Sequence, residues 1–296
     1  MSARARGMVI AVAALAGACA GGGGQPSTGP TLTAAPPTAS PPAADAGASI
    51  TGKVSVGAYA LFYSCAGAGS PTVFLEHGLG GDVRQWTDVF REVSKRTRVC
   101  DYSRVNTYLS DAVTGTHTVK DSVADAHALV AKAGIDGPYV LVGFSWGGLI
   151  SQAYASAYPS EVAGLVLVDA NNASEISTYW AHLTPEQVAQ DKVETGGPNP
   201  EQVDILRSFD EVRAGLQVPD VPLVVLSHTQ SDPEAWPAGW DQATFDGLQS
   251  GLQADLVRLT GHGTQVLVDG GHDIPDEHPE AVIAAIDQVL QAIGTP

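Results

Sequence analysis

Basic residues are scarce in this 296-residue chain, which has 15 Lys and Arg against 32 Asp and Glu and a formal net charge of -17. Such an acidic surface repels nucleic-acid phosphates and anionic lipid headgroups, so neither is expected as a ligand. Hydrophobic residues nevertheless make up 44% of the chain. That fraction is enough for a sizeable core, and the length suits one large domain or two small ones.

An apolar run long enough to span a bilayer is missing at the N-terminus, where residues 8–18 are apolar and follow two arginines. A short apolar core after positive charge is typical of a signal peptide, assigned here to residues 1–20. Small residues before Cys19 resemble a bacterial lipobox, whose cysteine is lipidated. Ordinary cleavage at small residues around the same position is the alternative. The protein is therefore expected to be exported, as a cell-surface lipoprotein held by that anchor or in secreted form.

Large apolar residues are nearly absent between residues 21 and 49, where Gly, Pro, Ser, Thr and Ala dominate. Such a segment cannot bury a core, so it is predicted to be a disordered tether before a folded domain at 50–296. Cysteine is rare as well, and beyond Cys19 the chain has only Cys65 and Cys100. An even pair in an exported protein indicates a disulfide, and two buried free thiols are the alternative.

From about residue 54 onward, short apolar runs rich in β-branched residues alternate with helical stretches. This pattern predicts an α/β domain with a mostly parallel central sheet and helices on both faces. The predicted strands are 72–76, 98–102, 139–142, 164–168, 223–226 and 265–268, with 59–63 as an antiparallel strand at the edge. The segment 171–218 has no strand pattern but contains helical fragments between prolines and glycines. It is predicted to be a small helical cap over a pocket.

The pentapeptide 143–147, GFSWG, follows one predicted strand and precedes a helical run at 148–158. A serine presented between a strand and a helix needs a very tight turn with positive φ. Glycines two positions either side of Ser145 prevent steric collision there. An ordinary glycine-rich turn is the alternative, but the strand before and the helix after favour Ser145 as a nucleophile.

Three motifs in the same order resemble those of the α/β-hydrolase superfamily. Besides GFSWG, the segment EHGLGG at 76–81 matches the family's oxyanion loop, and GHDIP at 271–275 matches its histidine loop. The resemblance covers nearly everything from residue 54 to residue 293. It implies the α/β-hydrolase fold with His272 as general base, and an oxyanion hole made by the backbone amides of Leu79 and Trp146.

The acid that orients His272 has two candidates. Asp169 ends the predicted strand 164–168, whereas Asp232 lies in the loop after the strand 223–226. The family commonly places its acid in the second of these positions, and some members use the first. Because the second loop is slightly longer than the family norm here, Asp169 is favoured and Asp232 stays as the alternative. His228, which also follows a strand, is the alternative base.

The resemblance bears on two further features. The family's sheet order places the strand that ends at Cys65 beside the strand that contains Cys100, which puts the two within reach of a disulfide. The segment 101–106, DYSRVN, departs from the family's usual Asp-Arg-x-Gly after this strand. That loop borders the pocket in relatives, so the departure weakens any analogy of substrate.

The expected activity is hydrolysis of a carboxylic ester of a small or medium substrate through an acyl-enzyme at Ser145, with no cofactor. Peptidase, thioesterase, lactonase and cofactor-free haloperoxidase activities use the same triad. A non-catalytic binding protein with this fold is the alternative of another class. The segment 272–278 contains acidic residues and two histidines, but no Cys or further His stands at a spacing typical of a metal site. No metal is therefore expected.

Overall fold

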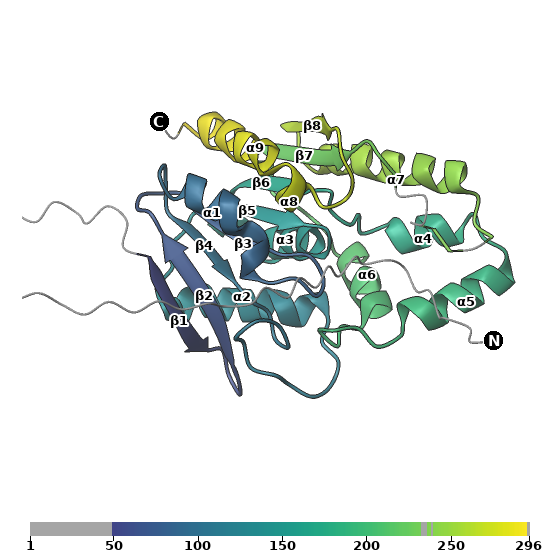
Figure 1. The fold of residues 1–296 in the computed structure, drawn as a ribbon, viewed down its shortest axis with the longest axis horizontal. Coiled ribbons are helices and arrows are strands. Elements are labelled where there is room, and N and C mark those ends of the chain that lie inside the picture. Colours follow the sequence, from purple (N-terminus) through teal and green to yellow (C-terminus); the bar gives the residue numbers. More distant parts are fainter. Residues whose placement is uncertain (1–48, 232–235, 238, 295–296) are drawn as a thin grey trace, which may run out of the picture.

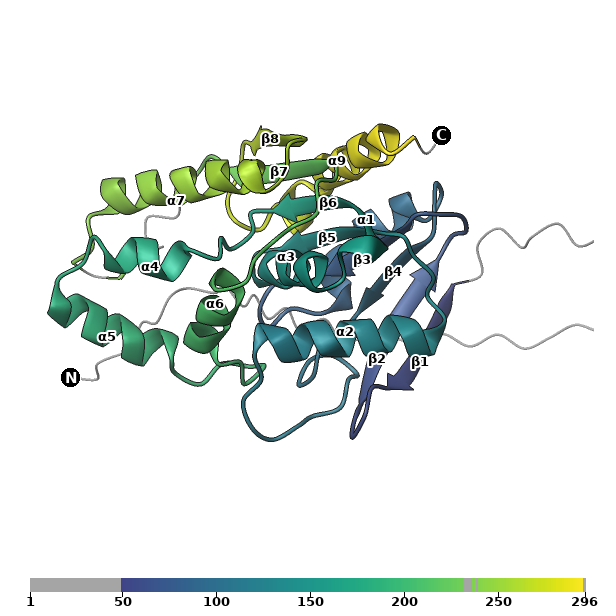
Figure 2. The same cartoon turned by 180° about the vertical axis from the view of Figure 1, so that it is seen from behind.

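The computed structural model describes residues 49–231, 236–237 and 239–294. They form an eight-stranded sheet in the order β1-β2-β4-β3-β5-β6-β7-β8, with helices on both faces (Figures 1 and 2). The strand β2 runs antiparallel to β1 and β4, and all other neighbours pair in parallel. The strands are β1 Ile50–Ser55, β2 Ala60–Ala66, β3 Thr72–Glu76, β4 Val99–Tyr102, β5 Tyr139–Phe144, β6 Val162–Val168, β7 Leu223–His228 and β8 Gly263–Val268. The predicted α/β architecture is confirmed.

One strand was missed by the sequence patterns. We expected residues 59–63 at the edge of the sheet, and this was wrong because β1 pairs along the outer side of β2. The sequence of β1, ITGKVS, leaves most of its side chains exposed or half-exposed. A strand that buries so little apolar surface carries almost no hydrophobic periodicity to detect.

The central strands β3, β5 and β6 are almost entirely buried, and their side chains alternate between two cores. Leu141 and Leu165 pack into the core beneath α2 and α3, whereas Val140 and Val166 pack into the core beneath α1 and α9. Figures 1 and 2 show these two helix pairs on opposite faces of the sheet. The four helices are α1 Thr87–Val93, α2 Val119–Ala133, α3 Trp146–Ala157 and α9 Pro279–Ala292.

Three short helices between β6 and β7 lie beyond the carboxyl ends of the strands (Figure 1). They are α4 Glu175–Trp180, α5 Pro185–Thr195 and α6 Ile205–Arg213, and α7 Gln242–Leu256 and α8 Ile274–Glu277 follow β7 and β8. Phe245 and Leu252 of α7 pack with Tyr179 of α4, and among the buried apolar residues of this helix only Leu256 joins the main core. The first part of α7 therefore extends the cap.

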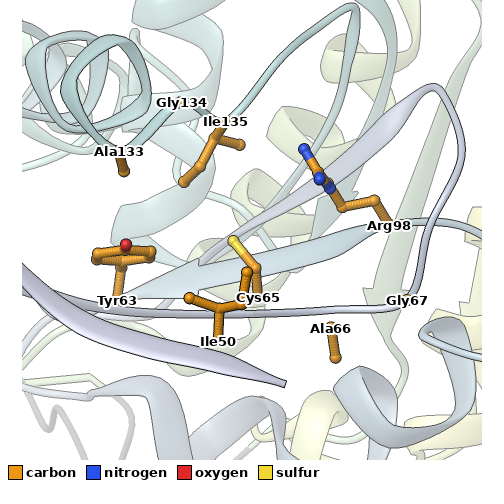
Figure 3. A pocket seen from close by; sticks show the side chains of 9 residues that line it. All are labelled: Ile50, Tyr63, Cys65, Ala66, Gly67, Arg98, Ala133, Gly134 and Ile135. Carbon is orange, nitrogen blue, oxygen red and sulfur yellow. The ribbon is translucent and has the colours of Figure 1, made fainter. Parts of the chain in front are cut away.

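A disulfide joins Cys65 of β2 to Cys100 of β4 in the structure, and the two residues are direct partners in the strand register. Figure 3 shows Cys65 in a surface pocket with Tyr63, Arg98 and Ile135. Arg98 directly precedes β4 and Ile135 precedes β5. The pocket therefore lies at the amino ends of the parallel strands, whereas Ser145 lies at their carboxyl ends.

The N-terminal features predicted from sequence, namely the signal peptide, Cys19 and the tether up to residue 48, lie outside the described residues, as does Asp232. Within the described ranges, no helix combines the length and the apolar character needed to cross a membrane.

Candidate active site

Ser145 makes the turn between β5 and α3 alone, because β5 ends at Phe144 and α3 begins at Trp146. Its backbone has φ 52° and ψ -118°, a conformation that residues other than glycine rarely adopt. A Cβ atom on Gly143 would lie 2.4 Å from the carbonyl oxygen of Gly147, and one on Gly147 would lie 2.3 Å from that of Glu76. Only glycine fits at these two positions, as the motif predicts.

The acid that is hydrogen-bonded to the predicted base is Asp169, which directly follows β6. Its side chain is completely buried, and its Oδ2 accepts a hydrogen bond of 2.5 Å from Nδ1 of His272. Since β5 and β6 are neighbours in the sheet, Asp169 and Ser145 follow adjacent strands at the same edge. The structure thus brings together Ser145, Asp169 and the loop of His272.

A second histidine binds the same carboxylate, which the sequence patterns did not reveal. Nδ1 of His228, the last residue of β7, donates to Asp169 Oδ2 over 2.6 Å. The backbone N–H of His228 also donates to Asp169 Oδ1 over 3.3 Å. His228, the alternative base, therefore contacts the same carboxylate oxygen as His272. The only available signal was its position directly after a strand of the parallel sheet.

These contacts set the pKa values of the Asp169 carboxyl and the His272 imidazole. Burial alone would raise the pKa of the Asp169 carboxyl, but the hydrogen bonds from His228 and His272 outweigh burial and lower this pKa to about 2. Burial disfavours protonation of His272, but its hydrogen bond with Asp169 and the negative charge there raise the pKa of His272 above its ordinary value. Both shifts favour an ionised Asp169 beside an imidazole that readily accepts a proton.

The loop after β3 lies against Ser145. A Cβ atom on Gly78 would lie 3.7 Å from Cβ of Ser145 and 3.0 Å from the ring of Phe144, so the absence of a side chain allows this close approach. The next residue, Leu79, is buried. Among the described residues, neither the Leu79 amide nor the Trp146 amide donates a hydrogen bond within the protein. Both N–H groups are thus available to an acceptor.

His77, in the same loop, is fully buried, and burial lowers its pKa well below the ordinary value. Its neutral ring contacts the carbonyl oxygen of Gly78 through Nδ1 over 2.8 Å, and its Nε2 accepts from the backbone N–H of Arg104 over 3.3 Å. These bonds assign the ring to holding the loop.

Another carboxyl lies near Asp169 and His272. Glu175 at the start of α4 is buried, and burial raises its pKa to about 7 against the hydrogen bonds from Asn171 and the Asn172 amide. Nδ2 of Asn171 lies 3.0 Å from each of its oxygens. Its position on the cap beside the acid was not expected from the sequence.

A metal could in principle use Asp169, His228 and His272, whose ligand atoms lie within 4.8 Å of one another. In the structure both Nδ1 atoms contact Asp169 Oδ2 at 2.6 Å or less. Such short contacts with an ionised carboxylate need a proton on each nitrogen, and a protonated imidazole nitrogen has no lone pair for a metal. The arrangement therefore fits a hydrogen-bonded acid–base group better than a metal centre.

Comparison with known proteins agrees with the observed fold. Residues 71–200 match the family model described as alpha/beta hydrolase fold. This span includes both the loop 76–81 and the tight turn at Ser145. Together with the eight-stranded sheet, this match shows that the described residues have the α/β-hydrolase fold. A thermophilic esterase from Thermogutta terrifontis has a TM-score of 0.61 at 23% identity, over 83% of this chain and all of that one. At such identity the likeness concerns the fold.

Sequence similarity to curated proteins is confined to part of the chain. A probable transporter, efuK, of Hormonema carpetanum is 30% identical over 126 residues, which are 40% of this chain and 18% of that protein. A proline iminopeptidase of Neisseria meningitidis serogroup A is 36% identical over 132 residues, which are 40% of this chain and 41% of that enzyme. The chain thus aligns with less than half the length of either relative.

Proposed function

We propose that this protein is a serine hydrolase that cleaves a carboxylic ester of a small or medium substrate through an acyl-enzyme at Ser145. The observation that carries the proposal is the hydrogen bond from His272 to the buried carboxylate of Asp169, which follows the strand next to that of Ser145. A carboxylate at Nδ1 fixes the imidazole tautomer, so that Nε2 keeps the lone pair that a base needs.

In the proposed reaction Ser145 Oγ attacks the ester carbonyl, and His272 Nε2 takes its proton. The oxyanion that forms is stabilised by the N–H groups of Leu79 and Trp146, each worth about 3–4 kcal/mol in the barrier. The intermediate then expels the alcohol, which takes the proton from His272. Water attacks the acyl-enzyme with His272 again as base, and the acid leaves as Ser145 recovers its proton. These steps use no cofactor.

The direct test replaces the nucleophile. Ser145→Ala should remove hydrolysis of p-nitrophenyl butyrate and labelling by a fluorophosphonate probe, while the thermal midpoint stays close to that of the parent. Ser160→Ala is a matched control, because Ser160 is exposed in the short 3-10 helix Pro159–Glu161 that precedes β6, at the opposite end of that strand from Asp169. Hydrolysis that persists in Ser145→Ala would reject the assignment. Folded parent protein that neither reacts with the probe nor hydrolyses any ester would favour a binding protein.

Peptide-bond cleavage is the second candidate, supported by the segment shared with the proline iminopeptidase. The same triad attacks an ester and an amide, so substrate preference depends on the residues that surround the bound substrate. Comparing kcat/KM on p-nitrophenyl esters and on aminoacyl p-nitroanilides separates the two. A higher kcat/KM on the anilides would replace the ester proposal with the peptidase one.

We also propose that the protein is exported, with Cys19 as the lipidation site of a cell-surface lipoprotein. The support is the sequence before Cys19 together with the apolar run at 8–18. Mass spectrometry of the mature N-terminus after expression in a bacterium that processes lipoproteins tests this. A diacylglyceryl group on Cys19 is expected, and an unmodified N-terminus beyond Cys19 would favour the secreted form.

A further inference from the structure

A buried arginine, Arg104, stands behind the proposed oxyanion loop and was not expected from the sequence to have any role. Its side chain is 3% exposed. Nη1 donates to the carbonyl oxygen of His77 over 2.8 Å and to Glu76 Oε2 over 3.3 Å. Nη2 donates to the carbonyl oxygen of Gly78 and to Glu201 Oε1, each over 2.8 Å, and Nε donates to Glu201 Oε2 over 2.7 Å. All five guanidinium N–H groups are therefore used.

The bond to the Gly78 carbonyl acts on the proposed oxyanion donor itself. The carbonyl of Gly78 and the N–H of Leu79 belong to one planar, trans peptide unit, so they point in opposite directions. A cation that holds the carbonyl fixes the direction of that N–H. It also polarises the peptide, which makes the N–H a stronger donor. Nδ1 of His77 and the N–H of Gly81 bind the same oxygen over 2.8 Å and 3.1 Å.

The other side of Leu79 is held by the cap. Glu201 lies between α5 and α6 and is 1% exposed. Its Oε1 accepts from the N–H of Gly80 over 2.6 Å, while both oxygens bind Arg104. Gly80 has φ 75°, so the turn after Leu79 needs the conformational freedom of glycine. One carboxylate of the cap thus holds the peptide after Leu79 directly and the peptide before it through Arg104.

We propose that Arg104 and Glu201 are positioning residues that aim the Leu79 amide at the oxyanion, so that the cap takes part in building the oxyanion hole. This inference rests on the proposed serine hydrolase function. A buried ion pair contributes little net stability, because desolvation offsets much of the attraction. Here, however, four of the bonds of the pair fall within residues 76–80, on the side chain of Glu76 at the end of β3 and on the backbone of His77, Gly78 and Gly80 around Leu79.

The experiment compares Glu201→Gln and Arg104→Lys with a matched cap variant, Asp191→Asn. Asp191 is also a buried carboxylate of the cap, but it binds Nε1 of Trp180 over 2.6 Å and makes no bond to the loop. For each variant we would measure kcat and KM on the best ester found. We would also measure inhibition by a trifluoromethyl ketone, which forms a tetrahedral oxyanion on the serine, and by the product carboxylate. Circular dichroism gives the folded fraction.

Glu201→Gln and Arg104→Lys should lower kcat by about 10²-fold, the lower end of the effect of losing one oxyanion donor. KM and the product inhibition constant should change by less than about threefold, whereas affinity for the ketone should fall in step with kcat. Asp191→Asn should leave the ratio of ketone to product affinity unchanged. A purely structural role predicts that all three variants lose activity only in proportion to the folded fraction, and that result would overturn the inference.

Two designs keep the outcome interpretable. If Arg104→Lys does not fold, Glu201→Gln and Glu201→Asp still test the inference, because they keep the arginine and a polar group at the cap. A parent enzyme that hydrolyses esters while these variants keep the parent's affinity for the ketone rejects only the positioning role. A parent that is unreactive toward esters and the fluorophosphonate probe rejects the proposed function itself.

Discussion

Ser145 and Asp169 occupy equivalent places on neighbouring strands, yet they are held in different ways. Each directly follows its strand, and each has a positive φ, 52° for Ser145 and 42° for Asp169. The serine is held by its own backbone turn. Glycines stand two positions before and after it, where no side chain would fit. The aspartate is held by two imidazoles, one from the last residue of β7 and one from the loop between β8 and α8. Local sequence therefore builds the turn at Ser145, the proposed nucleophile, whereas tertiary contacts hold Asp169, the proposed acid.

The largest expected effect tests the acid side. Asp169→Asn keeps the shape of the side chain but removes the charge that fixes the tautomer of His272, so kcat on the ester should fall by roughly 10⁴-fold. Asp232→Asn is the matched variant, because Asp232 is the other candidate acid. Stopped-flow or steady-state assays of both variants decide between them. A larger loss in Asp232→Asn would transfer the role of the acid to that residue.

A substitution in the tight turn at Ser145 should lower the stability of the protein as well as its activity. In Gly147→Ala the new methyl group would meet the backbone oxygen of Glu76 at 2.3 Å, so the turn must shift, at a cost of about 3 kcal/mol. Gly251→Ala in α7 is the control, since its Cβ would meet nothing within 4 Å, and an alanine there should stabilise the helix by about 0.5–1 kcal/mol. Urea unfolding measures both. Equal midpoints in the two variants would contradict the claim that local geometry holds the serine.

The same contrast explains what the sequence predicts and what it misses. The tight turn at Ser145, His272 and the strands of the sheet leave local signals, namely glycines at fixed offsets, short motifs and apolar runs. The link between Arg104 and Glu201 joins residues 97 positions apart, and that between Asp169 and His228 joins residues 59 apart. No local pattern predicts which distant charges will meet. The strand β1 was missed for a different reason, since its exposed side chains leave no periodicity.

The pH dependence of the parent enzyme follows from the raised pKa of His272. The base must be neutral to accept the proton of Ser145, so kcat/KM should rise with pH and reach half its plateau above pH 6.5, the ordinary histidine value. Asp169 stays ionised throughout this range because its pKa is lowered to about 2. A pH–rate profile on a neutral ester measures the midpoint. A midpoint below pH 6.5 would mean that burial outweighs the charge of Asp169.

The smallest effect is expected at His228, and it bears most directly on the comparison. The donor from His228 shares the negative charge of Asp169 Oδ2 with His272. In His228→Phe that charge acts on His272 alone, so the pKa of His272 should rise further and the midpoint of kcat/KM should move to higher pH. The acid also loses one support, and kcat at the plateau should fall by about tenfold, the lower end of the effect of losing one hydrogen bond to a charged group. His278→Phe is the control, since His278 contacts Glu280 and not the acid. An unshifted midpoint in His228→Phe would show that the acid, like the serine, is held without its distant partner.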